Sequence, residues 1–91
     1  MSYQGGNAIR LTAQFKDWDG ENVEPDLVKV IIYDRNYKKL QEHSIGQANR
    51  LDTGLFYFDL VINEGLYVYE WYSEIDGLPS LKRNLISISK M

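Results

Sequence analysis

The chain has 91 residues, the length of a single domain, and its 44% hydrophobic and 25% charged residues are typical of a folded globular protein rather than a disordered one. It contains no cysteine, which excludes disulfides, and its single histidine argues against a zinc site. The net charge of −3 disfavours nucleic acid as a partner, because binding to phosphates needs a basic surface.

Residues 1–8 are predicted to be a flexible lead or an extra edge strand, because Gly5 and Gly6 interrupt regular structure. Residues 9–91 are predicted to form a single β-sandwich domain. The chain begins without a basic region followed by an apolar run, so we expect no signal peptide. No apolar run approaches the ~20 residues that cross a bilayer, so we expect no membrane partner.

Apolar and polar residues alternate over residues 9–15, which predicts the first strand. Residues 16–26 are polar and rich in turn formers, so they are predicted to form a loop. Residues 27–33 carry apolar side chains on both faces, which predicts a second strand that is nearly buried on both sides. A turn over residues 34–37 leads to a short polar strand over residues 38–44, whose lysines suit the edge of a sheet.

The strongest signal lies in residues 52–73, where two alternating runs are joined by the short polar segment Asn63-Glu64-Gly65. This pattern predicts a β-hairpin with strands over residues 55–62 and 66–74. The preceding residues, 45–52, are predicted to be a connection without a strand. Five aromatic side chains of the hairpin are expected to pack in the core: Phe56, Phe58, Tyr67, Tyr69 and Trp71.

Residues 76–79 predict a turn, and residues from about 82 to 89 predict the last strand. No segment has the period of a helix, and short strands separated by turn residues are typical of sandwiches and barrels. The sequence therefore predicts an all-β fold, an immunoglobulin-like antiparallel β-sandwich of six to seven strands.

The predicted strand Leu11–Phe15 is followed along the chain by five short motifs: Asp17-Trp18-Asp19-Gly20, Val23-Glu24-Pro25, Val28–Asp34, Thr53–Phe58 and Gly65–Trp71. Their order resembles that of small immunoglobulin-like proteins of tailed phages and prophages, which have sandwiches of the fibronectin type III or macroglobulin kind. The first strand of a complete seven-stranded sandwich is not evident before Ile9.

The resemblance implies a non-enzymatic structural or interaction module, associated with a virion or present in the cytoplasm of a bacterial host. Its partner would be another protein or a second copy of the chain. It implies no cofactor and no catalytic residue. Similar modules occur in bacterial surface proteins, so a carbohydrate-binding or adhesin domain is the alternative.

Four of the aromatic residues outside the predicted core are candidates for an interaction surface: Trp18, Tyr37, Tyr57 and Tyr72. Exposed Tyr and Trp anchor protein interfaces, and they also stack on sugar rings. Three interpretations remain open for them, which are a protein contact, a carbohydrate contact and incidental exposure.

Two groups of polar residues are the candidates for chemistry. The segment Asp17–Asn22 offers oxygen ligands of the kind calcium takes, but Gly20 stands fourth rather than sixth, so the register of an EF-hand fails. A turn built on Asp and Gly is favoured there. The carboxylate pairs Glu70 with Glu74 and Asp59 with Glu70 are the candidates for acid/base work. Glu70 and Glu74 lie about 13 Å apart on an extended strand. Asp59 and Glu70 are expected to be cross-strand neighbours in the predicted hairpin, and a structural or solvating role is favoured for both pairs.

His43 lies on the predicted polar strand between Glu42 and Ser44. Neighbouring side chains of a strand point to opposite faces, so these three cannot form a catalytic triad. His43 is therefore predicted to be exposed to solvent. The sequence predicts no catalytic residue, no cofactor and no metal ligand.

Overall fold

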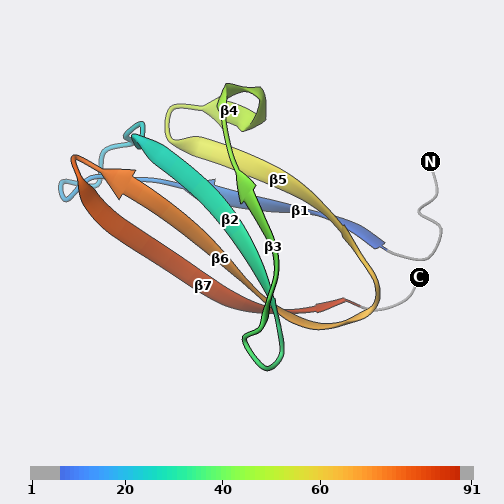
Figure 1. Ribbon diagram of the computed structural model, residues 1–91. Helices are drawn as coiled ribbons and strands as arrows, with labels where there is room; N and C mark the ends of the chain where they lie inside the picture. The colour runs from blue at the N-terminus through green and yellow to red at the C-terminus, as the bar shows by residue number, and fades with distance from the viewer. Residues whose placement is uncertain (1–6, 89–91) are drawn as a thin grey trace.

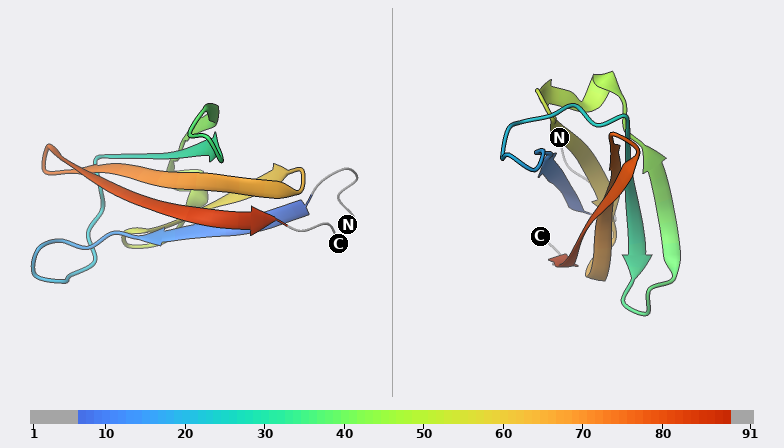
Figure 2. Two further views of the ribbon diagram at one scale, coloured as in Figure 1. Left: turned by 90° about the horizontal axis from the view of Figure 1, so that it is seen from below. Right: turned by 90° about the vertical axis from the view of Figure 1, so that its left-hand side faces the viewer.

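The computed structural model describes residues 7–88, which form two antiparallel sheets that face each other (Figures 1 and 2). An all-β fold is thereby confirmed, and its two layers are those of a β-sandwich. In chain order the elements are β1 (Asn7–Gln14), β2 (Leu27–Asp34), β3 (Lys39–Ser44), the short 3-10 helix η1 (Gln47–Asn49), β4 (Arg50–Asp52), β5 (Leu55–Ile62), β6 (Gly65–Ile75) and β7 (Leu78–Ile88).

One sheet has the strand order β1-β5-β4, and the other has the order β3-β2-β6-β7. The polar strand β3 lies at an edge, as its lysines predict. The connection predicted over residues 45–52 contains η1 and β4, so the prediction of no strand there is wrong. Asn7 and Ala8, predicted to belong to a lead or extra strand, are part of β1. The rest of that segment, and the predicted strand end at Ser89, lie outside the described residues.

The hairpin predicted over residues 52–73 is wrong, because β5 and β6 belong to different sheets. Instead of pairing by their edges, the two strands contribute inward-facing apolar residues to one core cluster between the sheets. The chain crosses between the layers at Asn63 and Glu64, and Gly65 has a φ of +152°, a conformation that side-chain-bearing residues rarely adopt. The Tyr67 hydroxyl donates a hydrogen bond to the carbonyl of Asn63 at 3.0 Å and fixes this crossing.

β6 instead forms a hairpin with β7, and the two strands pair from Gly65↔Ile88 to Ile75↔Leu78. Within residues 7–88, β2 also pairs with β3 and β4 with β5. The turn between β6 and β7 is only Asp76-Gly77, whose φ values of +53° and +78° are those of a tight hairpin turn. The predicted turn over residues 76–79 is therefore too long. Pro79 lies inside β7, where it is tolerated because an edge strand leaves one side of its backbone unpaired.

The core lies between the two sheets and is built by the inward-facing residues of both. The Phe15 ring contacts Phe56 and Trp71 edge-on, with centroid distances of 6.1 Å and 6.4 Å. Of the five aromatic residues predicted to pack in the core, Phe56 and Trp71 are buried. The other three are half-buried and pack against the core cluster: Phe58, Tyr67 and Tyr69. On β2, alternate residues from Val28 to Ile32 are fully buried, while the opposite face is half-buried.

Candidate interaction site

The four predicted interaction residues do not form one surface. Trp18 lies in the loop between β1 and β2, whereas Tyr37 lies in the turn between β2 and β3, at the opposite end of β2 (Figure 1). Tyr57 lies on the outer face of the three-stranded sheet, and Tyr72 lies on the outer face of the four-stranded sheet. The structure therefore separates these residues into four local environments.

Tyr57 and Tyr72 are half-buried and make contacts within the molecule. The guanidinium of Arg10 lies 4.1 Å from the centre of the Tyr57 ring and binds Asp59 through two hydrogen bonds of 2.8 and 3.0 Å. Tyr72 donates a 2.8 Å hydrogen bond to the carboxylate of Glu74, and this bond raises the pKa of Tyr72. Both rings are held by intramolecular partners.

Asp59 and Glu70 lie in different sheets, so the prediction that they are cross-strand neighbours is wrong. Glu70 is buried on the outer face of β6, where its Oε1 accepts hydrogen bonds of 3.0 and 2.6 Å from Arg83. The same guanidinium lies 5.5 Å from the ring of Tyr37. Burial, followed by the nearby Glu70 carboxylate, raises the pKa of Tyr33. This cluster ties β2, β6 and β7 together, which is a structural role.

His43 is half-buried rather than exposed, which corrects its predicted position. Its ring stacks on Phe58 with a centroid distance of 4.4 Å, and its Nε2 lies 2.9 Å from Oε1 of Gln41. The inward face of β3 covers the rim of the core here. His43 thus serves packing between an edge strand and the opposite sheet.

Trp18 stands at the tip of a tight loop and is the most exposed large hydrophobic residue described, at 94%. Asp17 closes this loop, because its Oδ1 accepts the backbone N–H groups of Asp19 and Glu21 at 2.9 and 3.0 Å. Gly20 has a φ of +82°, a conformation that glycine adopts readily and that reverses the chain direction in this loop. The loop therefore presents the indole to solvent instead of packing it on the core.

The hydrogen bonds accepted by Asp17 also bear on whether Asp17–Asn22 is a calcium site. One oxygen of Asp17 is already engaged by two backbone donors. Within residues 7–88 no three Asp, Glu, His or Cys side chains gather closely enough to hold a metal ion. The loop thus has the turn built on Asp and Gly that its sequence favours.

The backbone of the β1–β2 loop lies close to Gly54, and hydrogen bonds there anchor this loop to the three-stranded sheet. The N–H of Phe15 donates to the carbonyl of Gly54 at 2.8 Å, and Val23 donates to the carbonyl of Phe15 at 3.1 Å. Oε1 of Glu24 accepts the N–H of Gly54 at 2.6 Å and Nε of Arg50 at 2.9 Å. The bond from Gly54, followed by the one from Arg50, lowers the pKa of Glu24. Two motifs of the sequence, around Glu24 and Gly54, thus meet in space.

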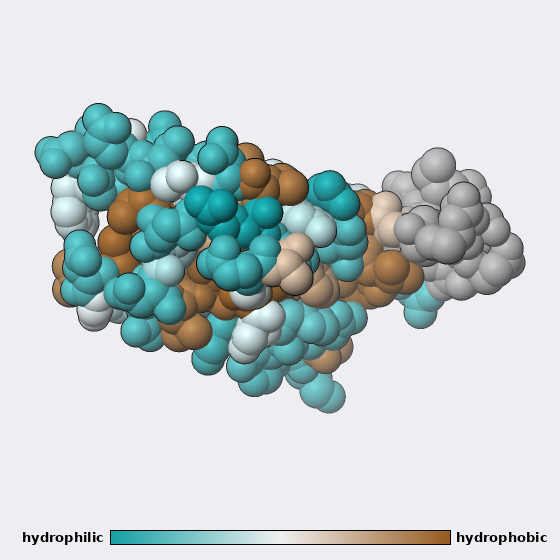
Figure 3. All heavy atoms as spheres, turned by 90° about the horizontal axis from the view of Figure 1, so that it is seen from above, coloured by the Kyte–Doolittle hydropathy of each residue, from teal (hydrophilic) through white to brown (hydrophobic). Residues whose placement is uncertain are grey.

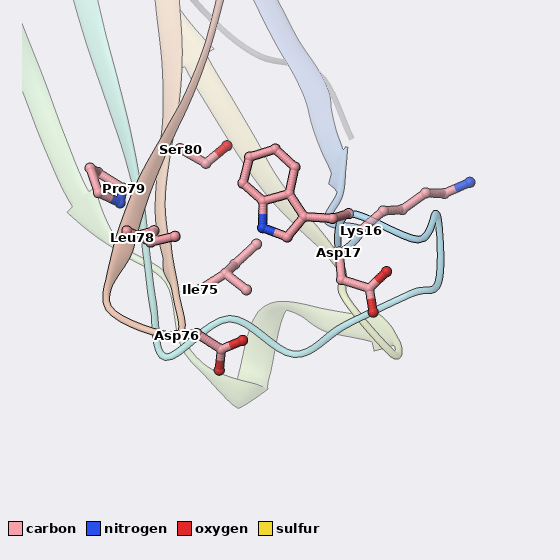
Figure 4. Close-up of a pocket in the computed structure, with 8 residues that line it drawn as sticks. Lys16, Asp17, Ile75, Asp76, Leu78, Pro79 and Ser80 are labelled. Atoms are coloured by element: carbon pink, nitrogen blue, oxygen red, sulfur yellow. The ribbon is translucent and has the colours of Figure 1, made fainter.

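Beside Trp18 lies a hollow of about 370 Å³ between the β1–β2 loop and the hairpin of β6 and β7 (Figure 4). Its apolar walls include Ile75 and Leu78, and Leu78 is 55% exposed. The residues that line it are Lys16, Asp17, Trp18, Ile75, Asp76, Leu78, Pro79 and Ser80. An open apolar cavity beside an exposed indole is the arrangement that anchors a side chain of a partner.

Sequence reasoning identifies Trp18 but misses the other wall of this hollow. The pattern of residues 76–79 places Leu78 and Pro79 in a turn, which leaves them without a defined direction. The dipeptide Asp76-Gly77 between alternating runs is typical of a two-residue hairpin, and this signal would have placed Leu78 in a strand. That the hairpin lies beside Trp18 depends on tertiary packing and has no local signal.

The fold and the hollow define a small all-β protein with a concave surface at one end of its two layers. No family model, no curated protein and no solved structure matches this chain. Among residues 7–88 there is no helix of the length and apolar character needed to cross a membrane.

Proposed function

We propose that this protein is a non-enzymatic interaction module that binds a protein partner at the hollow beside Trp18. The observation that carries the proposal is the exposure of Trp18, 94%, next to an apolar cavity. Tryptophan is enriched among the residues that dominate binding energies. The proposal concerns binding rather than catalysis because Glu24, Glu42 and Asp59, whose pKa values are lowered, each form a pair with Arg or Lys.

We propose further that the sandwich is immunoglobulin-like. Its strand orders, β1-β5-β4 and β3-β2-β6-β7, correspond to strands B-E-D and C′-C-F-G of such domains. The bond from the Tyr67 hydroxyl back to Asn63, at the start of β6, matches the tyrosine corner that these domains carry at the start of strand F. Both features support the immunoglobulin-like fold that the sequence resembles. A structural or assembly role in a phage or prophage is proposed from the sequence resemblance alone.

The alternative is a carbohydrate-binding domain. The rim of the hollow supports it, because Asp17, Asp76 and Ser80 offer hydrogen-bonding groups next to an exposed indole. A sugar ring stacks on an aromatic face and bonds to such groups at its edge.

The test is a selection of peptides from a random displayed library against the folded protein, together with a glycan array. We expect the selected peptides to bind at least about ten-fold more weakly to the Trp18→Ala variant. Leu85→Ala is the matched control, because Leu85 is 66% exposed but lies on the outer face of the four-stranded sheet. Peptides that depend on Leu85 and ignore Trp18 would refute the proposed site. Glycan binding that is lost in Trp18→Ala would favour the alternative, and light scattering separates self-association from binding to another protein.

A further inference from the structure

We infer that the hollow beside Trp18 takes a basic stretch of polypeptide that carries one apolar anchor residue. This inference rests on the proposed interaction function and specifies the chemistry of the partner. It follows from three features of this end of the sandwich, which are the apolar walls of the hollow, the charge around it and the exposed face of the indole.

The walls select an apolar anchor. Ile75 and Leu78 come from the hairpin, and Trp18 stands across from them on the β1–β2 loop. A volume of about 370 Å³ is near the lower end of the range of pockets that bind ligands, and it is large enough for a side chain of a partner. Burying one aliphatic side chain there removes apolar surface of both partners from water, which is the main driving force for association.

The charges around the hollow select a basic partner. Asp17 and Asp76 line the hollow. The loop and the hairpin that form it carry five further carboxylates, which are Asp19, Glu21, Glu24, Asp26 and Glu74. Arg50 compensates Glu24 at 2.9 Å. One lysine, Lys16, also lines the hollow, and its side chain extends away from the hairpin residues (Figure 4). Lys82 donates a hydrogen bond to the carbonyl of Gln14 at 2.9 Å. The space-filling view shows hydrophilic residues around hydrophobic ones at this end, on the left (Figure 3).

The indole adds a second reason for a cationic partner. Because Trp18 is almost fully exposed, its face is free to receive an ammonium or guanidinium group. Such contacts contribute most with tryptophan, and carboxylates beside the ring strengthen the attraction for a cation. The molecule uses the same contact internally, where Arg10 covers Tyr57 and binds Asp59.

The same charges disfavour two other occupants. A second copy of the chain that docked through this end would bring two acidic surfaces together, which is repulsive. A nucleic acid would be repelled for the same reason. A basic polypeptide is the macromolecule that matches both the apolar walls and the acidic rim.

The experiment titrates the isotope-labelled protein with three synthetic peptides of equal length, followed by NMR. The first has one leucine flanked by lysines, the second replaces the lysines with glutamates, and the third keeps the lysines but replaces the leucine with glycine. We expect the first peptide to shift the resonances of residues 16–20 and 75–80, and the other two to bind at least about ten-fold more weakly. Raising the salt from about 0.05 M to about 0.5 M should weaken the first peptide several-fold, because the rim charges are solvent-exposed.

The variants Asp17→Asn and Asp76→Asn remove charge and keep the local geometry. An amide oxygen at position 17 can still accept the two loop N–H groups, and asparagine tolerates the positive φ of residue 76. We expect binding of the lysine peptide to weaken about three-fold for each change and about ten-fold for both. Glu64→Gln, at the other end of β6, is the matched control and should leave binding unchanged.

The outcomes separate this inference from the proposed function. Equal binding of the lysine and glutamate peptides at residues 16–20 and 75–80 would overturn the inferred charge preference and leave the interaction site standing. So would binding of an oligosaccharide at these residues without binding of the lysine peptide. If the lysine peptide shifts only resonances elsewhere, or if Trp18→Ala binds it as well as the wild type does, both the inference and the site are wrong.

Discussion

The two tryptophans of the chain occupy opposite environments. Trp71 is 1% exposed and packs edge-on against Phe15, whereas Trp18 is 94% exposed. The difference arises from their elements, because Trp71 lies on the inward face of the central strand β6 and Trp18 lies at the tip of a loop. One tryptophan therefore serves stability, and the other is available for binding.

This contrast predicts different results for the same substitution at the two positions. Trp71→Ala should lower the free energy of unfolding by about 3–5 kcal/mol, because it empties a large volume of the core. Trp18→Ala should change it by less than about 0.5 kcal/mol, as expected for a surface side chain. Urea unfolding of both variants measures the difference. A Trp71→Ala protein as stable as the wild type would show that the core does not depend on this ring.

Gly54 is the residue where the chain tolerates no side chain. Its φ is +68°, and a Cβ atom at this position would overlap the carbonyl oxygens of Val23 and Phe15. Those carbonyls belong to the backbone that anchors the Trp18 loop, so they cannot move without disturbing the hydrogen bonds of that loop. Gly20 has a similar φ of +82°, but no atom lies within 4 Å of a Cβ built there.

Comparing alanine substitutions at Gly20 and Gly54 separates the cost of the steric clash from the cost of the positive φ. Gly20→Ala should lose about 1–2 kcal/mol of stability, from the positive φ alone. Gly54→Ala should lose at least about 3 kcal/mol, since the clash adds to the same term. Thermal unfolding of the two variants provides the comparison. Equal losses would mean that the neighbouring backbone shifts at little cost.

At the scale of elements, the alternation of residues locates the strands well but does not identify their neighbours. The strand predicted over residues 55–62 matches β5, and the prediction over 66–74 lies within β6. The alternation of apolar and polar residues determines which side chains share a face of a strand. The same alternation is expected whether two strands pair by their edges or pack face to face in different sheets. The short connection at Asn63-Glu64 therefore has the sequence pattern of a hairpin, although it crosses between sheets.

The candidate site could be predicted only in part for a similar reason. The exposure of Trp18 follows from a local sequence of turn-forming residues, which can be recognised without the fold. The burial of Glu70 has no such signal, because it depends on Arg83 being its partner in the register of β6 and β7. The approach of Leu78 to Trp18 likewise requires that two loops lie at the same end of the sandwich.

The strands also differ in how firmly they are held, which leads to a prediction for amide exchange. β6 pairs with β2 on one side and with β7 on the other, whereas β4 has three residues at the edge of its sheet and pairs only with β5. Amides of residues 68–73 should exchange at least about a hundred-fold more slowly than those of residues 50–52. Hydrogen exchange followed by NMR tests this order. The strand β3, at the edge of the other sheet, provides a second edge strand for comparison. Equal rates in β4 and β6 would indicate that the two sheets open as one unit.

At the scale of the whole molecule, the charges form a framework of ion pairs on the outer surface. Arg10 pairs with Asp59 across β1 and β5, Lys39 pairs with Glu42 within β3, and Arg50 pairs with Glu24 between β4 and the β1–β2 loop. The pKa of Asp59 is lowered mainly by its hydrogen bond from Arg10, and that of Glu42 by its bond from Lys39. Together with Glu24, these carboxylates bind protons less readily in the folded state than in the unfolded chain.

The sign of the resulting pH dependence follows from these lowered pKa values. As the pH falls below about 5, the unfolded chain takes up protons on these carboxylates before the folded protein does, so protonation favours unfolding. The stabilisation that they provide is complete above that pH and is lost as the pH falls through their folded pKa values. We therefore expect the melting temperature to be nearly constant between about pH 7 and about pH 5.5 and to fall toward pH ~3.

Two variants test whether the ion pairs of Asp59 and Glu24 cause this loss of stability in acid. Arg10→Gln should return the pKa of Asp59 toward its ordinary value, so the fall in melting temperature with acid should become shallower. Glu24→Gln removes one titrating group but keeps an acceptor for the N–H of Gly54, so it should act in the same direction. If Arg10→Gln and Glu24→Gln keep the slope of the wild type, these two ion pairs do not cause the acid sensitivity.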